Sequence, residues 1–367
     1  MQRSRRAAGV VAAVAIAAVL LSGCTHVAPG DRPEISPGAT LSATVADAVT
    51  AVGVSDGDLW PSCWSDDDAL YAANGDGSGF GSTTSDIVMN RITGSPASND
   101  LEGTGLASGD ARKPTGMLCA GGTLYLAVQD LRKDFNAAPS ATIARSDNHG
   151  KTWHWHTAAP MFEHGVFTTI WFADFGRDAA HAPDDGYAYA YGLDGNWRDS
   201  FDDSVPDPTE LFLARVPLAS VQDASTWEFF AGEPGDAEPT WTTDIAHKRP
   251  VLIDERRVHD VSVLSQGGVT FLPNAKRYLY TSWTEYTFEF YESPSPWGPW
   301  ALLHSDDFGT YPWSEQSYGG YATTIPSKFV AADERTMWVQ SNVCPCAPAG
   351  MTSCWFGLRT LELTPEE

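Results

Sequence analysis

The chain has 367 residues and a formal net charge of −24 at pH 7. This excess of negative charge argues against nucleic acid and anionic lipid headgroups as partners, because phosphates would be repelled, and it leaves a neutral or cationic ligand open. The 33 glycines, 14 tryptophans and 12 tyrosines are typical of a β-rich protein with aromatic surfaces.

The first residues have the pattern of an export signal. Arg3, Arg5 and Arg6 precede an apolar run, 7–21, that is short for a transmembrane helix. The run ends in Leu21-Ser22-Gly23-Cys24, which matches the bacterial lipoprotein signal. We therefore expect residues 1–23 to be removed and Cys24 to carry a diacylglyceryl group that anchors an extracytoplasmic protein to the cell membrane. A plain secretory signal with an incidental cysteine, and an uncleaved anchor, are the alternatives.

Composition places the domain boundary near residue 41. Residues 24–41 are rich in Ala, Thr, Pro and Ser and predict a flexible tether. Residues 42–367 predict a single all-β domain, because short alternating runs broken by Gly, Asp, Asn and Pro take the place of any long 3.6-residue period. The stretch 42–54 is apolar enough to rejoin the domain as a strand.

The alternating runs recur as pairs of strands joined by polar turns. The pairs are 59–64 with 69–74, 116–119 with 124–129, 168–174 with 187–191, 261–271 with 278–283, and 322–330 with 337–341. One or two further strand candidates follow each pair, which predicts a five-bladed β-propeller. The last unit lacks a clear fourth strand, and residues 42–54 could supply it. A β-sandwich or two smaller β domains would give a similar alternation.

Five cysteines follow Cys24, so at least one thiol is free or bonded to another molecule. Cys63 and Cys119 lie at similar places in successive strand pairs and could bond to each other. Cys354 shares a Pro/Gly-rich loop with Cys344 and Cys346, which predicts a local disulfide to Cys354 in an oxidising compartment. A metal site at these last three cysteines is the alternative, although no histidine lies nearby.

The first strand pair places two aspartates at the open end of a hairpin. With the turn centred near Asp67, position 58 pairs with about position 76, and paired Cα atoms lie roughly 5 Å apart. Two carboxylates so placed repel, so that one holds a raised pKa or both bind a cation. Glycosidases need such an unequal pair, so Asp58 and Asp76 are the candidate catalytic residues of a polysaccharide hydrolase. In the structural alternative, Asp76 serves the Gly-rich turn and Asp58 caps a loop.

Other residues are candidates for the same face. Trp60, Trp64, Trp171 and Trp283 lie on expected inner strands, where core packing is commoner than stacking on a sugar, and only Trp60, next to Asp58, is a candidate to stack on a sugar ring. Further expected contacts to an oligosaccharide come from polar residues at the ends or starts of later strand pairs: Asp174, His259 and Glu315, with Glu163 as a second candidate for a third carboxyl and His164 beside it. For each of these, a solvated loop position or a satisfied structural role is the alternative.

The acidic run Asp66–Asp68 lies in the opposite turn of the hairpin. Solvated turn residues are the simpler interpretation, and a structural Ca²⁺ site is the alternative. No phosphate-binding loop, dinucleotide fingerprint or zinc pattern is present, so we expect no cofactor and no catalytic metal.

Residues 146–153, Ser-Asp-Asn-His-Gly-Lys-Thr-Trp, resemble the Asp-box of sialidases and related propellers, with Asn148 in place of the usual aspartate. The motif folds a tight turn between outer strands, in which the polar side chain accepts hydrogen bonds from backbone amides. Asn148 can accept these bonds, so we expect the turn to form. Its role is structural and marks no active site.

Two further segments, 210–232 and 291–303, resemble the outer strands of arabinanase-like propellers. The chain is most similar to an actinobacterial family described as a domain of unknown function, which includes endo-acting D-arabinanases. That resemblance implies catalytic roles for Asp58 in Asp58-Leu59 and for Asp76 in Gly75-Asp76. The chain departs from the family pattern at Trp60, where glycine is common, at Asn74, where an aromatic residue is common, and at Gly77, where threonine is common. A non-catalytic lipoprotein that binds glycans or a partner protein is the alternative.

Overall fold

The computed structural model describes residues 34–47, 51–52, 54–109, 112–155, 159–200, 204–307, 309, 321–343 and 354–366. The expected signal peptide and lipidated Cys24, and the candidate Glu315, lie outside these residues. The described part is all-β, as the sequence predicts, with short 3-10 turns as its only helices. None of the helices in these ranges has the length and apolar character needed to cross a membrane.

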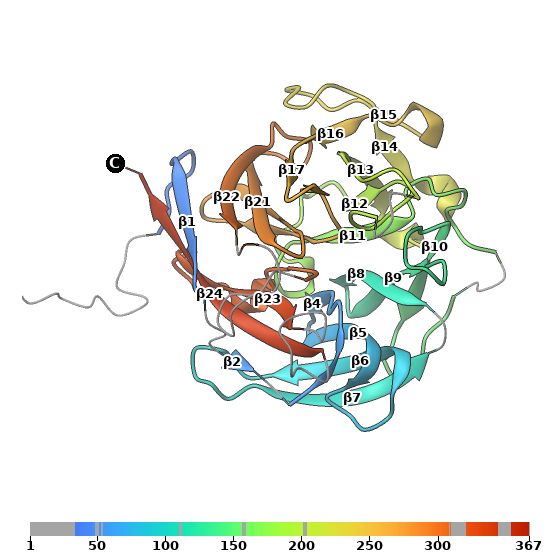
Figure 1. Ribbon diagram of the computed structural model, residues 1–367, viewed down its shortest axis with the longest axis vertical. Coiled ribbons are helices and arrows are strands. Elements are labelled where there is room, and N and C mark those ends of the chain that lie inside the picture. The colour runs from blue at the N-terminus through green and yellow to red at the C-terminus, as the bar shows by residue number, and fades with distance from the viewer. Residues whose placement is uncertain are drawn as a thin grey trace, which may run out of the picture.

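The strands form antiparallel meanders that follow one another along the chain (Figure 1). The first sheet contains β3 (Asp56–Asp58), β4 (Ser62–Trp64), β5 (Leu70–Gly79), β6 (Ser85–Thr93) and β7 (Glu102–Gly109). The second contains β8 (Lys113–Ala120), β9 (Thr123–Asp130) and β10 (Ser140–Ser146). In Figure 1, β4, β8 and β11 lie toward the middle of the molecule and β7 lies at its edge.

The third and fourth meanders join into one sheet, because β11 pairs in parallel with β19. The third contains β11 (Thr169–Asp174), β12 (Tyr187–Leu193), β13 (Glu210–Pro217), β14 (Glu228–Phe230), β15 (Trp241–Thr242) and β16 (Pro250–Ile253). The fourth contains β19 (Gly268–Leu272), β20 (Arg277–Trp283), β21 (Thr287–Ser293) and β22 (Ala301–Asp307). A separate hairpin, β17 (Arg257–Val258) and β18 (Val261–Ser262), precedes β19.

The N-terminal strand pairs with the last sheet, as the sequence suggests. That sheet contains β23 (Thr336–Val343), β24 (Trp355–Pro365), β1 (Leu41–Val45) and β2 (Ala51–Val52), and both β1 and β2 pair with β24. The expected strand over 322–330 is wrong: only two isolated bridges form there, because the 3-10 turn Ser327–Phe329 follows Pro326. Likewise, in the described part (152–155) of the expected strand over 152–156, only His154 forms a bridge.

Apolar side chains pack between neighbouring sheets. At the contact of the second and third meanders, Gly116 has no room for a side chain, because a Cβ atom there would lie 2.3 Å from the Cα of Trp171. Cys63 in β4 and Cys119 in β8 form a disulfide, which joins the first two sheets as their positions suggest. Cys354 is also disulfide-bonded.

The Asp-box turn forms as expected with asparagine in the acceptor position. Asn148 Oδ1 accepts a hydrogen bond from the backbone N–H of Thr152 at 2.9 Å, and the Trp153 indole donates to the Gly150 carbonyl at 3.1 Å. The left-handed backbone at His149 and Gly150 completes the turn. From there residues 151–155 run back along β10, through the bridge between His154 and Arg145.

Candidate active site

Asp58 lies at the end of β3, where the chain turns sharply before entering β4. Leu59 and Trp60 both have left-handed backbone conformations, with φ of 73° and 55°. A β-bulge separates Asp56, which pairs with Gly79, from Asp58, which pairs with Gly75. Bulky residues rarely adopt positive φ, and such strain is most often found at functional sites. The hairpin thus places Asp58 next to Gly75, one residue from the position expected from simple counting.

Gly75 provides the space for the Asp58 carboxyl. A Cβ atom on Gly75 would lie 2.5 Å from Asp58 Oδ1 and 3.3 Å from the Leu59 side chain. Any residue larger than glycine therefore displaces the carboxyl group or the strand. This contact gives a physical reason for glycine at this position, directly before Asp76.

Lys113, the first residue of β8, lies near both aspartates. Its ammonium group forms an ion pair with Asp76, and its side chain is 11% exposed while that of Asp76 is 48% exposed. The Lys113 stem also borders the site of a Gly75 Cβ atom, 3.5 Å away, on the side where Asp58 lies. The second sheet thus contributes a cation that pairs with Asp76 and lies near enough to Asp58 to act on its carboxyl electrostatically.

The two carboxyl groups have different environments. Burial raises the pKa of Asp58 to about 6, the Lys113 ammonium opposes this rise, and the Asp76 carboxylate adds to it. Asp58 Oδ1 is buried and accepts no hydrogen bond from any residue that the structure describes. Asp76 is more exposed and is paired with a cation. The site therefore combines a buried acid that holds its proton to near-neutral pH with a solvated carboxylate.

Aromatic residues from later meanders border the same end of the hairpin. The Tyr321 hydroxyl donates to Asp58 Oδ2 at 3.4 Å, and its ring lies 5.0 Å from that of Trp283 and 6.0 Å from that of Trp197. Leu59 belongs to the same apolar cluster. Asp58 therefore lies where residues from the first, second, third and fourth meanders and residue 321 meet.

The structure corrects the proposed role of Trp60. This side chain is fully buried between Phe80 and Phe356, with ring centroids 5.5 and 5.3 Å away, and its indole donates to the Gly57 carbonyl. The left-handed turn at Leu59 and Trp60 directs it into the core. Trp60 therefore cannot stack on a sugar, and it holds the strained turn in place.

Asp174 also lies away from the pair. Its carboxylate accepts bonds from the backbone and hydroxyl of Ser327 at 2.9 and 2.7 Å and from the Gly176 N–H at 3.0 Å. Shortly after it, Arg177 donates to the backbone of Asp66, in the closed turn of the first hairpin. Asp174 thus lies toward the opposite end of the strands from Asp58, and its carboxyl, whose pKa burial raises, is used in structural bonds.

His259 is at the tip of the hairpin formed by β17 and β18. Its ring is 29% exposed, bonds to Asp307 at 2.8 Å and packs edge-on against Tyr286 at 5.4 Å. It remains accessible but is not among the groups that contact Asp58 or Asp76. Glu163 and His164 form part of an exposed turn before β11.

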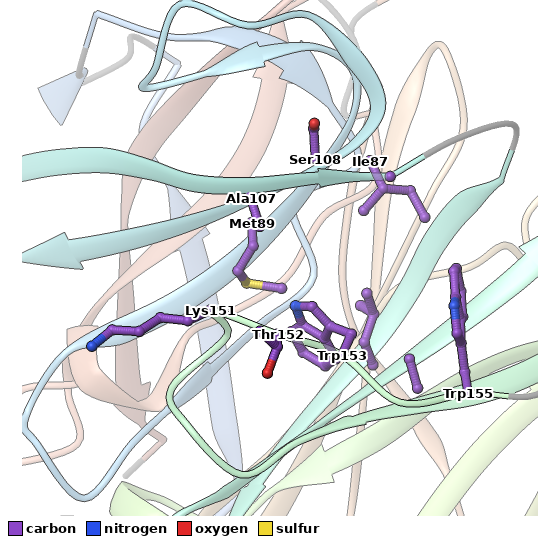
Figure 2. Close-up of a pocket in the computed structure, with 11 residues that line it drawn as sticks. Ile87, Met89, Ala107, Ser108, Lys151, Thr152, Trp153 and Trp155 are labelled. Atoms are coloured by element: carbon purple, nitrogen blue, oxygen red, sulfur yellow. The ribbon is translucent and has the colours of Figure 1, made fainter.

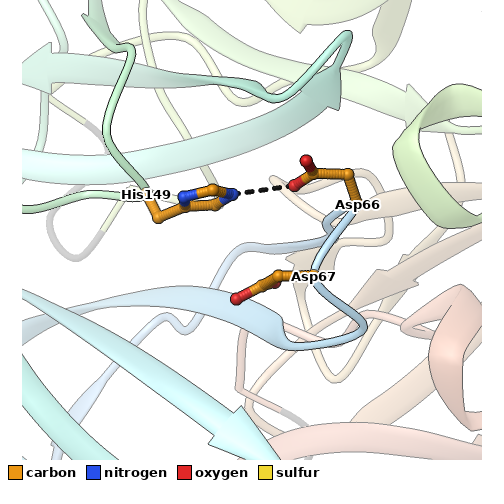
Figure 3. A group of neighbouring side chains, drawn as sticks. All are labelled: Asp66, Asp67 and His149. Carbon is orange, nitrogen blue, oxygen red and sulfur yellow. Dashed lines mark hydrogen bonds and ion pairs between the residues drawn. The ribbon is translucent and has the colours of Figure 1, made fainter.

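The closed turn brings three potential metal ligands together. Ligand atoms of Asp66, Asp67 and His149 all lie within 4.8 Å of one another (Figure 3). Each aspartate already has a partner, however: Asp66 bonds to the His149 ring at 2.8 Å, and Asp67 pairs with Arg91 at 2.9 Å. Both carboxylates of the cluster are thus engaged by protein partners.

Two residues of the site, Lys113 and Tyr321, are not identified by the sequence analysis. Lys113 precedes the second strand pair and Tyr321 precedes the fifth, and neither belongs to a motif. The one available signal is position, because the start of each inner strand faces the open end of the first hairpin.

A profile of the family described as "Domain of unknown function (DUF4185)" matches residues 88–328. No match was found among curated proteins. Among solved structures, the α-L-arabinofuranosidase from Podospora anserina in complex with cellotriose aligns with a TM-score of 0.46 and 10% identity, over 90% of this chain and 99% of that chain. The GH43_1 enzyme from Xanthomonas citri complexed with xylotriose gives a TM-score of 0.48 and 14% identity, over 87% and 90% of the two chains. Likenesses this remote do not establish a shared active site.

Proposed function

This chain belongs to the DUF4185 family, and we propose that it is a glycoside hydrolase that cuts a furanose-containing, arabinan-type polysaccharide. The observation that carries this proposal is the unequal carboxyl pair Asp58 and Asp76, with Lys113 paired to Asp76. The substrate class follows from the resemblance of Asp58-Leu59 and Gly75-Asp76 to the pattern of endo-D-arabinanases. The same resemblance and the run of meanders support a five-bladed propeller, with residues 42–367 as its single domain.

The pair supplies the two groups that glycosidic hydrolysis requires. Asp58, which keeps its proton up to about pH 6, donates it to the leaving oxygen. Asp76, the exposed carboxylate, activates water or attacks the sugar. Lys113 is a positioning residue that pairs with Asp76 and limits the rise in the pKa of Asp58, and Tyr321 orients the Asp58 carboxyl.

We further propose that the protein acts outside the cytoplasm, attached to the cell membrane by the lipid on Cys24. The signal pattern at residues 21–24 supports this location. A lipid-linked hydrolase at the membrane surface would meet cell-wall polysaccharide, and the disulfide between Cys63 and Cys119 suits an oxidising compartment. Radiolabelled palmitate should be incorporated into the wild-type protein and not into a Cys24→Ala variant.

The activity is tested with purified protein and a panel of arabinans and other cell-wall polysaccharides, with mass-spectrometric product analysis. We expect oligosaccharide products from arabinan, and a loss of about 10³-fold in Asp58→Asn and Asp76→Asn, the range found for general acid–base groups. Circular dichroism checks that both variants are folded. Binding of a polysaccharide with no cleavage would instead support a non-catalytic glycan-binding protein, and equal turnover in all three proteins would remove the assignment of the pair.

A further inference from the structure

The first sheet has two faces, and Asp58 belongs to the face that packs on the second sheet. Gly75 pairs with Asp58 on one side and with Ile87 on the other, and directly paired residues project from the same face. Ile87 is part of an apolar cluster with residues of the second sheet, and it lines a groove together with Trp153 (Figure 2). Asp58 and Gly75 are therefore on the side from which Lys113 approaches.

Asp76 would face away from Asp58 in a regular strand. Successive residues of a strand project to opposite faces, and Asp76 directly follows Gly75. Its carboxylate nonetheless pairs with Lys113, whose stem lies 3.5 Å from the position of a Gly75 Cβ atom. The backbone gives the reason, because Asp76 has a left-handed conformation, with φ of 45°, within β5. An irregularity in β5 thus brings Asp76 to the side of Asp58.

This irregularity is a bulge of β5 against β3. Three residues of β5, 76–78, lie opposite the single residue Gly57 of β3. The fit between the strands is close, since a Cβ atom on Gly77 would lie 2.3 Å from the carbonyl oxygen of Asp56. A bulge interrupts the hydrogen bonds of the ladder, so the buried backbone groups beside it need other partners.

Two buried asparagines on the opposite face supply these partners. The Asn74 amide donates to the carbonyl of Gly75 at 3.2 Å and to that of Asp56 at 3.4 Å. Asn90 in β6 donates to Asn74 Oδ1 at 2.8 Å and accepts from the backbone N–H of Phe80 at 2.9 Å. Both asparagine side chains are fully buried. The two amides therefore bond to both strands at the bulge and to the residue that follows β5.

Glycine backbone encloses the two amides. A Cβ atom on Gly57 would lie 2.1 Å from Asn74 Nδ2, and one on Gly79 would lie 2.1 Å from Asn90 Oδ1. Both glycines have positive φ, 133° and 59°, so the chain passes around the amides in conformations that other residues rarely adopt. The amides and the bulge therefore fit each other, and a change in one displaces the other.

We propose that Asn74 and Asn90 are positioning residues of the site, which hold the bulge in β5 that turns Asp76 toward Asp58. Their catalytic importance rests on the proposed function, because the bulge sets the distance between the two carboxyl groups. Both asparagines are buried on the other face of the sheet, so they act through Asp76.

The first test replaces the amide donor by an apolar group of similar size, in Asn74→Leu. We expect kcat on linear arabinan to fall about 100-fold with KM within about twofold, the effect of a reacting group displaced by about 1 Å. Gln222→Leu is the matched control, because Gln222 also donates to two backbone carbonyls, those of Ile143 and His154. It should keep full activity. Circular dichroism checks folding, and an unchanged kcat in Asn74→Leu overturns the proposal.

The second test needs no activity. The Asp76 carboxylate raises the pKa of Asp58, so its withdrawal lowers the midpoint at which the Asp58 carboxyl titrates in ¹³C NMR spectra. Asn74→Leu should lower this midpoint by as much as Asp76→Asn does, and the double variant should lower it no further. Gly77→Ala disturbs the same bulge from the side of β3 and should give the same shift, so the test does not depend on the folding of one variant.

The two tests separate this proposal from the proposed activity. If wild type cleaves nothing and the midpoint falls as expected, the catalytic proposal fails and the positioning role stands. If wild type cleaves arabinan and Asn74→Leu keeps both its rate and its midpoint, the positioning role fails and the activity stands. A further fall in the double variant, or no fall in Asp76→Asn, also overturns the positioning role, since the amides would then not act through Asp76.

Discussion

The two ends of the first hairpin are both acidic, but their carboxyl groups are in opposite electrostatic states. At the closed turn, Asp67 is bonded by Arg91, Tyr71 and a backbone amide, and these bonds outweigh burial and lower its pKa. Hydrogen bonding to His149 lowers the pKa of Asp66. At the open end, burial raises the pKa of Asp58 to about 6 and one of its oxygens has no hydrogen-bond partner among the described residues.

This difference shows that density of acidic residues is a poor guide to chemistry. The closed turn has three consecutive aspartates, and the protein uses them for bonds that hold the turn to Arg91, His149 and Lys328. The open end keeps one carboxyl oxygen, Asp58 Oδ1, buried and without a hydrogen bond from any described residue, which costs stability. Groups with strongly perturbed pKa values cluster at functional sites, which favours a chemical role for Asp58.

Asp58→Asn should have the largest effect and should separate activity from stability. Activity is expected to fall about 10³-fold, because the proton donor is lost. Since the folded-state pKa is above the unfolded value, the Asp58 carboxyl favours folding at low pH, and this contribution is lost as pH rises through 6. The variant should therefore be more stable than wild type at pH 8, by up to about 3 kcal/mol.

Thermal unfolding of both proteins at pH 5 and pH 8 measures this stability effect. The gain in melting temperature from Asp58→Asn should be larger at pH 8. A variant that is inactive and equally destabilised at both pH values would show that Asp58 is a structural residue.

Gly75→Ala tests whether the space beside Asp58 matters. Gly75 does not have a left-handed backbone, so alanine brings no backbone strain and the clash at 2.5 Å with Asp58 Oδ1 is its main effect. We expect about a 100-fold loss of activity from the displaced carboxyl and a loss of about 1–3 kcal/mol in stability from overpacking. Steady-state kinetics of the double variant with Asp58→Asn supplies the control: the second change should lower activity no further, because both act through one carboxyl.

Sequence reasoning predicts the neighbourhood of the pair and misses its details for identifiable reasons. Residues 58 and 76 lie at equal distances from the centre of the hairpin turn, so counting along the chain predicts that they are neighbours. The left-handed turn at Leu59 and Trp60 cannot be predicted in this way, and it shifts the register and buries Trp60. No local pattern reports that turn, since neither residue is a glycine. Lys113 and Tyr321 come from other meanders, so only the packing of the sheets brings them to Asp58. The Asn148 substitution, in contrast, was predictable because its hydrogen bonds lie within a single turn.

Lys113→Met should shift the pH dependence of activity with a smaller loss of rate, about tenfold. The Lys113 ammonium lowers the pKa of Asp58, so its removal raises that pKa further. Because the proton donor works only while protonated, the fall in kcat/KM at high pH should move upward by about one pH unit. Lys328→Met, which removes the cation paired with Asp68 at the closed turn, should leave the profile in place. A profile that does not move in Lys113→Met contradicts a role for this cation at the pair.

Asp67→Asn should have the smallest effect and the opposite sign to Asp58→Asn. The pKa of Asp67 is lowered in the folded protein, so its carboxylate adds stability that is present above pH 4 and is lost as pH falls through the folded-state pKa. The Arg91 and Asp67 side chains are 37% and 28% exposed, and exposed ion pairs contribute at most about 1 kcal/mol. We expect Asp67→Asn to keep full activity and to be destabilised by about 0.5–1 kcal/mol at pH 7 and by less at pH 3. Denaturant unfolding at the two pH values measures this. If Asp67→Asn instead abolished activity, the closed turn would be the functional end, and the contrast between the two ends of the hairpin would be reversed.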